Sequence, residues 1–431
     1  MAKQPEKLIK ENVHVLLKKG NNVKVFRAER DRKIVFDKRT FCLNAALDQP
    51  FGTSWEVSKN NIIPVRTTER LQGEVQSASD NRDIQDDTGS QRLDRDDIMN
   101  LKEQGVSGEG IVEQLVDNSK SFTNKTAYSQ EKYLKKKKEK YITKFTIYKP
   151  NVRLLCGVFF NKVPSPKIIC LREDTLAQLL TCTNVQAGSK VMVVENCQGL
   201  LMASVLERLA GKGTIVQFHS EDRPVMIAED LLDLPCEYRD IALRMQLRDF
   251  NKVVKGEGSS CLKGVAGEEG DIAEAMDTHE TGHSGALVSE DVEAQEEDSL
   301  THKTRKRDFK DNSEREKKKI VRMEKHRKIK ELLEKRDMDS LLIACRFQPA
   351  LLLNHLLEYL APSRPFVVYS SFKEPLVECF KQLKDNGSVV NMNLTETWLR
   401  HYQILENRTH PMISMSGTGG YILTGTKISY T

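Results

Sequence analysis

The sequence lacks three features that would assign it to a membrane-bound or secreted class. No uninterrupted apolar run approaches the roughly 20 residues of a membrane span. The first residues, Met-Ala-Lys-Gln-Pro-Glu-Lys, contain no apolar core of a signal peptide. The nine cysteines include no Cys-x-x-Cys pair, and the histidines do not cluster. We therefore expect a protein of a reducing compartment, without contact to a membrane, a disulfide framework or a metal site.

The net charge of +5 is small, but the charges are unevenly distributed along the chain. Residues 268–298 contain twelve acidic residues and no Lys or Arg, whereas residues 303–336 contain sixteen basic and seven acidic residues. A further basic run occupies residues 135–138. Such an uneven distribution favours a polyanion as the partner more than the net charge does.

The first third of the chain predicts a small β-domain followed by a helical segment. Short β-rich runs separated by turn residues over 13–57 predict an antiparallel β-barrel within residues 1–75. Residues 76–144 combine a polar linker with a basic helical segment. The 431 residues leave room for at least one further domain.

The remainder predicts one α/β domain that an insertion divides into two halves. Alternating strands and helices over 145–255 and 337–431 are typical of a Rossmann-like, class I methyltransferase-type sheet whose last strand is antiparallel. Residues 256–336 are too polar and charged to bury a core, so we expect a mostly disordered insertion. Residues 303–335 within it predict a charged helix with a thin apolar stripe that includes Ile320, Met323, Ile329 and Leu333.

A βαβ unit lies at the centre of this domain. Residues 190–195 form an apolar run of strand length, Gly199 opens a helix over 200–210, and residues 214–218 form a second strand. A strand, a glycine turn, a helix and a strand constitute the nucleotide-binding half of a doubly wound sheet.

The turn of this unit is poor in glycine. A turn that binds a dinucleotide or S-adenosylmethionine needs several glycines so that the backbone can approach the ligand, yet only Gly199 stands beside Asn196, Cys197 and Gln198. Gln217 occupies about the position where an acidic residue should bind a ribose hydroxyl, and it lacks the charge for a strong hydrogen bond. We expect a retained scaffold without a cofactor; the alternative is a divergent cofactor site.

A basic helix over residues 129–141 is the first candidate for contact with nucleic acid. It carries Lys140 and the run Lys135, Lys136, Lys137 and Lys138 close to Tyr133 and Tyr141. A basic helical face beside aromatic side chains suits contacts with phosphates. A solvated helix and a nuclear import signal are the alternatives.

Several segments together resemble the non-catalytic subunit of the tRNA adenine N1-methyltransferase that modifies the T-loop adenosine of eukaryotic tRNAs. The resemblance covers residues 18–428 apart from the insertion. It rests on the basic run, Asp174-Thr-Leu-Ala-Gln178, Glu195 to Gly199, Arg346-Phe-Gln-Pro349, Pro362-Ser-Arg-Pro-Phe-Val-Val-Tyr369, Glu396-Thr-Trp-Leu-Arg400, and His410-Pro with Ser414-Met-Ser-Gly417.

The resemblance implies a nuclear, non-enzymatic chain that helps to hold tRNA. It implies a paralogous catalytic subunit that binds S-adenosylmethionine, and a heterotetramer of two plus two chains. It also implies that Ala344 occupies the position of an acidic residue in the catalytic paralogue. Alanine can neither accept a hydrogen bond from the adenine amino group nor act as a base.

Three arginines join the lysines as candidates for tRNA contact. Arg346 and Arg364 are expected near the carboxyl edge of the sheet, where ligands of this fold bind. Arg400 lies next to Trp398, whose ring could stack on a base. An ion pair or an interface with the catalytic subunit is the alternative for the arginines, and a core or interface position is the alternative for Trp398.

Two other functions remain open at the level of sequence. The chain could be an active S-adenosylmethionine-dependent RNA methyltransferase with a divergent pocket, which the acidic residues Glu195 and Asp222 would favour. It could also be a nuclear or translation-associated RNA-binding scaffold that acts through the charged insertion.

Overall fold

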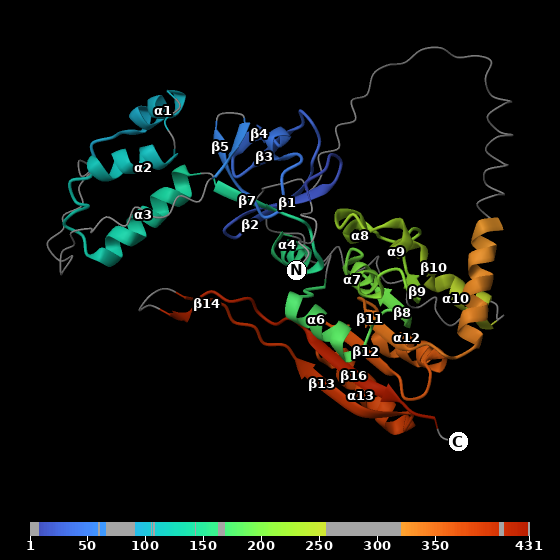
Figure 1. Ribbon diagram of the computed structural model, residues 1–431. Coiled ribbons are helices and arrows are strands. Elements are labelled where there is room, and N and C mark those ends of the chain that lie inside the picture. Colours follow the sequence, from blue (N-terminus) through green and yellow to red (C-terminus); the bar gives the residue numbers. More distant parts are fainter. Residues whose placement is uncertain are drawn as a thin grey trace, which may run out of the picture. The chain divides into compact units, whose positions relative to one another are not determined.

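The computed structural model describes residues 8–58, 61–65, 91–104, 106, 108–142, 144–162, 169–255, 320–404 and 409–429 (Figure 1). The chain divides into two compact units, Met1–Val158 with Leu231–Asp233, and Phe159–Asp230 with Leu234–Thr431. Within the described ranges, no helix is both long enough and apolar enough to cross a membrane.

The first unit contains the expected antiparallel β-domain. A five-stranded sheet with the order β2-β1-β7-β5-β6 and the separate hairpin β3–β4 share one apolar core, to which Trp55, Phe36 and Phe41 contribute. The strands are β1 (His14–Lys19), β2 (Asn22–Arg27), β3 (Lys33–Phe36), β4 (Arg39–Cys42), β5 (Ser54–Ser58), β6 (Asn61–Pro64) and β7 (Lys144–Tyr148).

The predicted start of the α/β domain at residue 145 is wrong. Strand β7 pairs with β1 and β5 of the N-terminal sheet, and its Phe145 and Ile147 are buried in that core. The helix α4 (Val152–Lys162) follows this strand. The N-terminal domain is therefore completed by a strand that is distant in sequence.

A helical segment is inserted between β6 and β7. Ile111, Val112 and Leu115 pack against Tyr141 and Ile142 to form a small core of its own. The side chain of Thr126 caps the third helix by accepting a hydrogen bond from the backbone N–H of Ser129. The helices are α1 (Arg95–Glu103), α2 (Gly108–Asp117) and α3 (Ala127–Tyr141).

The second unit is built on a seven-stranded sheet with the order β10-β9-β8-β11-β12-β16-β13. The first five strands of this order are parallel, and β16 is antiparallel to both β12 and β13. This topology confirms the predicted fold class. The strands are β8 (Lys190–Glu195), β9 (Thr214–His219), β10 (Ala242–Gln246), β11 (Ser340–Ala344), β12 (Pro365–Ser370), β13 (Val389–Glu396) and β16 (Tyr421–Lys427).

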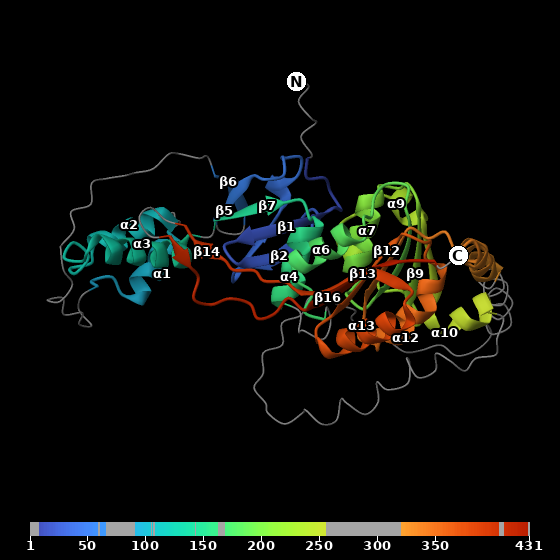
Figure 2. The same cartoon turned by 90° about the horizontal axis from the view of Figure 1, so that it is seen from below.

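Helices cover both faces of this sheet, so its central strands β8, β11 and β12 are buried along almost their whole length. Figure 2 shows α7 and α9 on one side and α10, α12 and α13 on the other. The helices are α6 (Glu173–Cys182), α7 (Leu200–Leu209), α8 (Ile227–Leu231), α9 (Cys236–Asp240), α10 (Leu247–Phe250), α12 (Pro349–Leu356) and α13 (Glu374–Asn386).

The expected insertion is shorter than predicted at its C-terminal end. Residues 256–319 lie outside the described ranges, but residues 320–334 form a helix. Its Ile329 and Leu333 are fully buried in the core with α12 and α13, whereas Ile320 and Met323 of the predicted stripe are exposed. The second half of the α/β domain therefore begins before residue 337.

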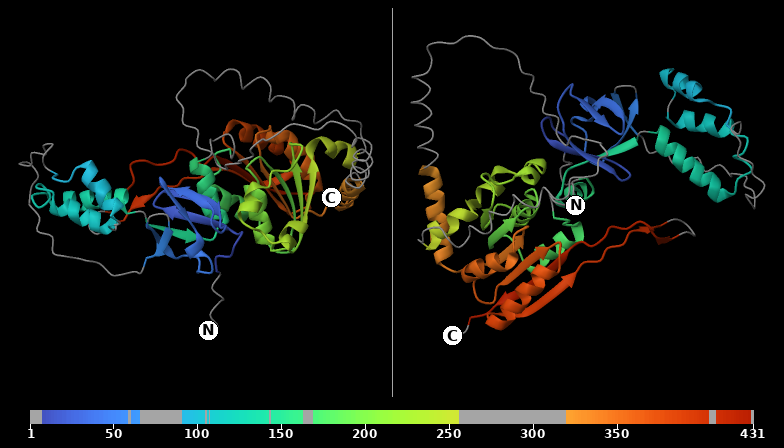
Figure 3. Two further views of the ribbon diagram at one scale, coloured as in Figure 1. Left: turned by 90° about the horizontal axis from the view of Figure 1, so that it is seen from above. Right: turned by 180° about the vertical axis from the view of Figure 1, so that it is seen from behind.

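The segment between β13 and β16 leaves the sheet, and we call residues 397–420 the arm (Figure 3). Two short antiparallel strands, β14 (Tyr402–Gln403) and β15 (His410–Pro411), pair within it. Thr397 and residues 416–419 form the two roots of the arm at the sheet.

Candidate functional site

The glycine turn after β8 keeps the backbone shape of a nucleotide-binding turn. Gly199 has φ 77° and Gln198 has φ 58°, both in the left-handed region. The side chain of Glu195, the last residue of β8, accepts hydrogen bonds from the backbone N–H of Leu201 (3.1 Å) and Met202 (2.9 Å). A carboxyl group of the protein itself therefore caps α7 at the end where a cofactor would lie.

Glu195 is buried to an extent that changes its chemistry. Only 7% of the residue is exposed. Burial raises the pKa of its carboxyl group to about 7, although the hydrogen bonds from Met202 and Leu201 act in the opposite direction. A carboxyl that binds protons near neutral pH and is turned into the helix end serves the fold rather than a ligand.

The chain itself covers the turn. A Cβ atom on Gly199 would lie 2.8 Å from the carbonyl oxygen of Val225, and the backbone N–H of Ala228 donates to the carbonyl oxygen of Gln198 (3.1 Å). Gly199 is therefore needed for close packing of the protein against itself.

The pocket that remains beside the turn has a volume of about 50 Å³ and is lined by Glu195, Gln198, His219 and Arg346, among others. Ligand pockets usually measure about 300 Å³ or more. S-adenosylmethionine, which the fold would suggest, does not fit the residues present.

Gln217, the fourth residue of β9, lines this small pocket together with Glu195 and Gly199, about where the sequence placed it. Its Oε1 accepts a hydrogen bond from Nε of Arg244 (2.8 Å). Arg244 in turn donates to both carboxylate oxygens of Glu229 (2.7 and 2.8 Å). Residues 217, 229 and 244 thus form a buried polar cluster between β9, β10 and α8.

Ala344 ends β11 directly beside Glu195 of β8. Its carbonyl oxygen accepts hydrogen bonds from the backbone N–H of Asn196 (2.9 Å) and from Sγ of Cys197 (3.6 Å). Two of the predicted degenerate positions, Asn196 and Cys197, are therefore bonded to a third, Ala344. The others, Gln198, Gly199 and Gln217, line the same small pocket as Asn196 and Cys197. No side chain at Ala344 is available to accept a proton from a substrate.

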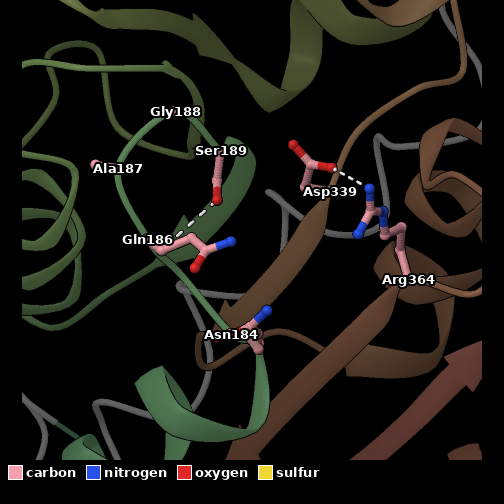
Figure 4. Close-up of a pocket in the computed structure, with 8 residues that line it drawn as sticks. Asn184, Gln186, Ala187, Gly188, Ser189, Asp339 and Arg364 are labelled. Carbon is pink, nitrogen blue, oxygen red and sulfur yellow. Dashed lines mark hydrogen bonds and ion pairs between the residues drawn. The ribbon is translucent and has the colours of Figure 1, made fainter.

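Arg346 and Arg364 lie at opposite edges of the sheet. Arg346 lines the small pocket at the carboxyl edge, as expected. Arg364 precedes β12, so the prediction that it lies at the carboxyl edge is wrong. It lines a polar pocket of about 240 Å³ at the amino ends of β8, β11 and β12, and Figure 4 shows its ion pair with Asp339 (3.1 Å). Because β12 is parallel to β11, the residue directly before it lies at the amino edge, so the position of Arg364 in the sequence already indicated that edge.

Arg400 and Trp398 belong to the arm. Nη2 of Arg400 lies 3.5 Å from the carbonyl oxygen of Met412, on the other side of the arm. Trp398 is 70% exposed, so the core alternative is excluded for its ring. The three candidate arginines of this unit do not form one patch.

The lysines of the basic helix α3 are exposed at positions 132, 135, 136, 138 and 140, and Nζ of Lys140 lies 5.2 Å from the centre of the Tyr141 ring. Lys132, Lys136 and Lys140 are exposed and follow one another at four-residue intervals, about 6 Å apart along the axis. Lys137 instead is half-buried, with Nζ 5.1 Å from the centre of the Tyr133 ring. Burial first, and then the charges of Lys140 and Lys125, lower the pKa of Lys137. Lys132 precedes the uninterrupted run and was not among the predicted site residues.

Residues 8–248 match the Gcd10p family. This chain belongs to the Gcd10p family. The predicted resemblance is thereby confirmed.

Two curated relatives bear the same functional name, "tRNA (adenine(58)-N(1))-methyltransferase non-catalytic subunit". The protein from Mus musculus is 38% identical over 95% of this chain and 86% of its own length. The protein from Dictyostelium discoideum is 32% identical over 100% of this chain and 81% of its own length.

A solved structure supports the fold of this Gcd10p-family chain. The SAM-dependent O-methyltransferase from Thermotoga maritima covers 100% of the chain with a TM-score of 0.52, and 98% of the bacterial chain is covered. At 10% identity this likeness concerns the fold alone. The Gcd10p-family chain thus combines a methyltransferase architecture with a closed cofactor turn.

Proposed function

We propose that this chain is the non-catalytic, tRNA-binding subunit of a tRNA N1-methyladenosine methyltransferase that acts on the T-loop adenosine, position 58 in the names of its relatives. One observation carries the proposal: the carbonyl oxygen of Val225 and the segment up to Ala228 close the Gly199 turn, in a chain whose relatives are named non-catalytic. A domain that keeps the fold without a cofactor pocket suits binding and assembly.

A catalytic paralogue would supply S-adenosylmethionine and the catalytic acid, and we propose a heterotetramer of two plus two chains. The arm supports such a partner. Trp398, Tyr402, Ile404 and Ile413 are exposed by 54–92%, which is unusual for large apolar side chains. Apolar side chains gathered on one projecting segment are typical of a protein interface.

The tRNA would be held mainly by phosphate contacts. The row Lys132, Lys136 and Lys140 on α3 offers three exposed ammonium groups at regular spacing. Arg346 at the carboxyl edge of the sheet would add a further contact. We keep Lys135, Lys138, Arg364 and Arg400 as weaker candidates, and we propose that Lys137 has a structural role because it packs on Tyr133.

Replacement of the lysine row should weaken tRNA binding. We expect that K132A/K136A/K140A, measured as the complex with the catalytic subunit, raises the Kd for tRNA by about 10- to 100-fold near 100 mM salt. The slope of log K against log salt should fall by about 2 to 3, because each lost phosphate contact removes about 0.7–0.9 from the slope. Filter binding at four salt concentrations provides both values.

Lys137 provides the matched control on the same helix. K137M should leave the salt slope unchanged and affect only the stability of the helical segment. An equal loss of affinity in K137M and the triple variant would mean that α3 acts through its fold rather than through the row.

Binding of S-adenosylmethionine to the chain alone tests the other half of the proposal. We expect isothermal titration to show no binding at micromolar affinity. Binding at that level would instead support an active enzyme with a divergent pocket.

Nuclear location remains a proposal, supported by the basic clusters at 135–138 and 303–307, and microscopy of a fluorescent fusion would test it.

A further inference from the structure

One buried arginine, Arg172, contacts three segments that are distant along the chain from the Gly199 turn. They contain Asp174, Thr397 and Ser416. Arg172 precedes α6, and only 5% of its side chain is exposed. Its guanidinium donates to both carboxylate oxygens of Asp174, at 2.6 and 2.9 Å. It also donates to Oγ of Ser416 (2.9 Å) and to the carbonyl oxygens of Gly417 (2.9 Å) and Thr397 (3.1 Å). Both roots of the arm are therefore bound to one side chain.

A second set of contacts also joins the roots of the arm to the start of α6. Oγ1 of Thr175 lies 2.7 Å from Oγ1 of Thr397 and donates to the carbonyl oxygen of Gly419 (2.9 Å). A Cβ atom on Gly419 would lie 2.6–2.9 Å from Thr397, Thr175 and Arg172. The arm roots thus meet the start of α6 without space for another side chain at residue 419.

The charge of this cluster is balanced within the protein. Burial alone would raise the pKa of Asp174, but the hydrogen bonds and the charge of Arg172 outweigh it and lower the pKa. Asp174 therefore stays ionised beside Arg172 at neutral pH. A buried ion pair with further hydrogen bonds from the arginine fixes geometry more than it adds stability.

The arm that these contacts hold is suited to a protein and poorly suited to RNA. Trp398, Ile404 and Ile413 are 70%, 79% and 92% exposed. Residues 398–415 include Arg400 and Arg408 as their only Lys or Arg. Aliphatic side chains cannot neutralise phosphates, on which affinity for RNA depends. A second chain with an apolar surface and an accessible strand edge is the partner that this composition favours.

We propose that Arg172 is a positioning residue for subunit assembly, which ties both roots of the arm to α6 so that the arm is presented to the catalytic methyltransferase chain in a fixed direction. The identity of that partner rests on the proposed function, whereas the hydrogen bonds between Arg172 and the arm do not depend on it. A segment that is ordered before binding loses less conformational entropy on association. The contacts of Arg172 should therefore increase the affinity of the arm for the catalytic chain.

The experiment uses the full chain with the conservative variant R172K. Lysine keeps the charge but has three donors on a single nitrogen and cannot reach the six acceptor atoms that Arg172 contacts. We expect hydrogen exchange of the described arm residues to accelerate by at least about tenfold in the chain alone. The Kd for the catalytic chain, measured by biolayer interferometry, should rise by about tenfold, and D174N should give the same pattern in weaker form.

Two controls separate positioning from general destabilisation. R208K replaces an exposed arginine of α7, whose Nη1 donates to the carbonyl oxygen of Leu180 in α6 (3.2 Å), and should change neither measurement. L209A creates a cavity in the core at a fully buried site, so it should lower Tm without accelerating exchange in the arm.

The outcomes are distinct. Unchanged hydrogen exchange in the arm of R172K would overturn the claim that Arg172 fixes the arm. Faster exchange with unchanged affinity for the catalytic chain would overturn the role in assembly and leave the proposed function intact. Protection of the arm by tRNA, and not by the catalytic chain, would overturn a protein as the occupant. Failure of the unmodified chain to bind the catalytic chain would contradict the proposed function, while the exchange measurement would still test whether Arg172 fixes the arm.

Discussion

The variant R244M should lose about 3–5 kcal/mol of the free energy of unfolding of the second unit at pH 8. Arg244 donates to both oxygens of the Glu229 carboxylate, and the side chain of Glu229 is 0% exposed. Removal of one partner leaves a buried charge without compensation, which is far costlier than replacement of the whole pair. Urea unfolding, followed by pulsed hydrogen exchange in β8, β9 and β10, measures the loss in this unit.

The loss in R244M should depend on pH. Burial raises the pKa of Glu229, more than the charge and hydrogen bonds of Arg244 lower it, so without Arg244 the carboxyl will take up a proton more readily. The variant should therefore recover part of its stability at pH 5, and E229Q/R244M should recover at least half at pH 8.

A surface pair supplies the control for R244M. Arg248 and Asp222 form an ion pair at 3.0 Å, with side chains 61% and 87% exposed. R248M should cost less than about 1 kcal/mol because water already screens that pair. A comparable loss in R248M and R244M would show that burial of the cluster is not what stabilises this region.

The second large effect concerns Glu195 and pH. A pKa that is raised from 4.5 to about 7 on folding corresponds to about 3 kcal/mol. Because the folded-state pKa is the higher one, this stability is fully present below about pH 4.5 and is lost as pH rises through 7. The difference in unfolding free energy between E195Q and the unmodified chain should therefore change by about 3 kcal/mol between pH 5 and pH 8, in favour of the variant.

Glutamine at position 195 can accept only one of the two backbone hydrogen bonds, from Leu201 and Met202, that the carboxyl accepts. The loss of one hydrogen bond lowers the stability of E195Q by the same amount at every pH. It therefore does not alter how the difference in unfolding free energy changes with pH. E237Q, at an exposed position of α9, should give a flat difference. A flat difference in E195Q as well would mean that Glu195 is charged in the folded protein at neutral pH and free to serve a ligand.

The central sheet was predictable because its signals are local. The apolar run at 190–195, the glycine at 199 and the periodic helix at 200–210 are adjacent in sequence, and β8 and α7 follow them closely. The sparse glycine content of the turn predicted a scaffold without a cofactor, and the binding measurement proposed above tests that prediction. By contrast, no local pattern indicated that β7 pairs with β1 and β5 of the N-terminal sheet.

Contacts between residues that are distant along the chain could not be predicted from the sequence. The pairing of Glu229 with Arg244, and of Arg172 with both arm roots, depends on the positions of strands and loops up to 245 residues apart. The error on Arg364 has a different cause, because its position directly before the parallel strand β12 already fixes it at the amino edge. Charged residues within otherwise apolar segments, such as Arg172 before Asp174-Thr-Leu-Ala, were the available signal, since a buried charge needs a partner.

Methyl transfer to tRNA from radiolabelled S-adenosylmethionine tests the account most directly. The assay compares the co-purified complex, the catalytic subunit alone and this chain alone, each with the same tRNA. We predict that only the complex transfers methyl groups, and that K132A/K136A/K140A reduces transfer at limiting tRNA without dissociating the complex. Methyl transfer by this chain alone would contradict the closed turn at Gly199 and the non-catalytic role.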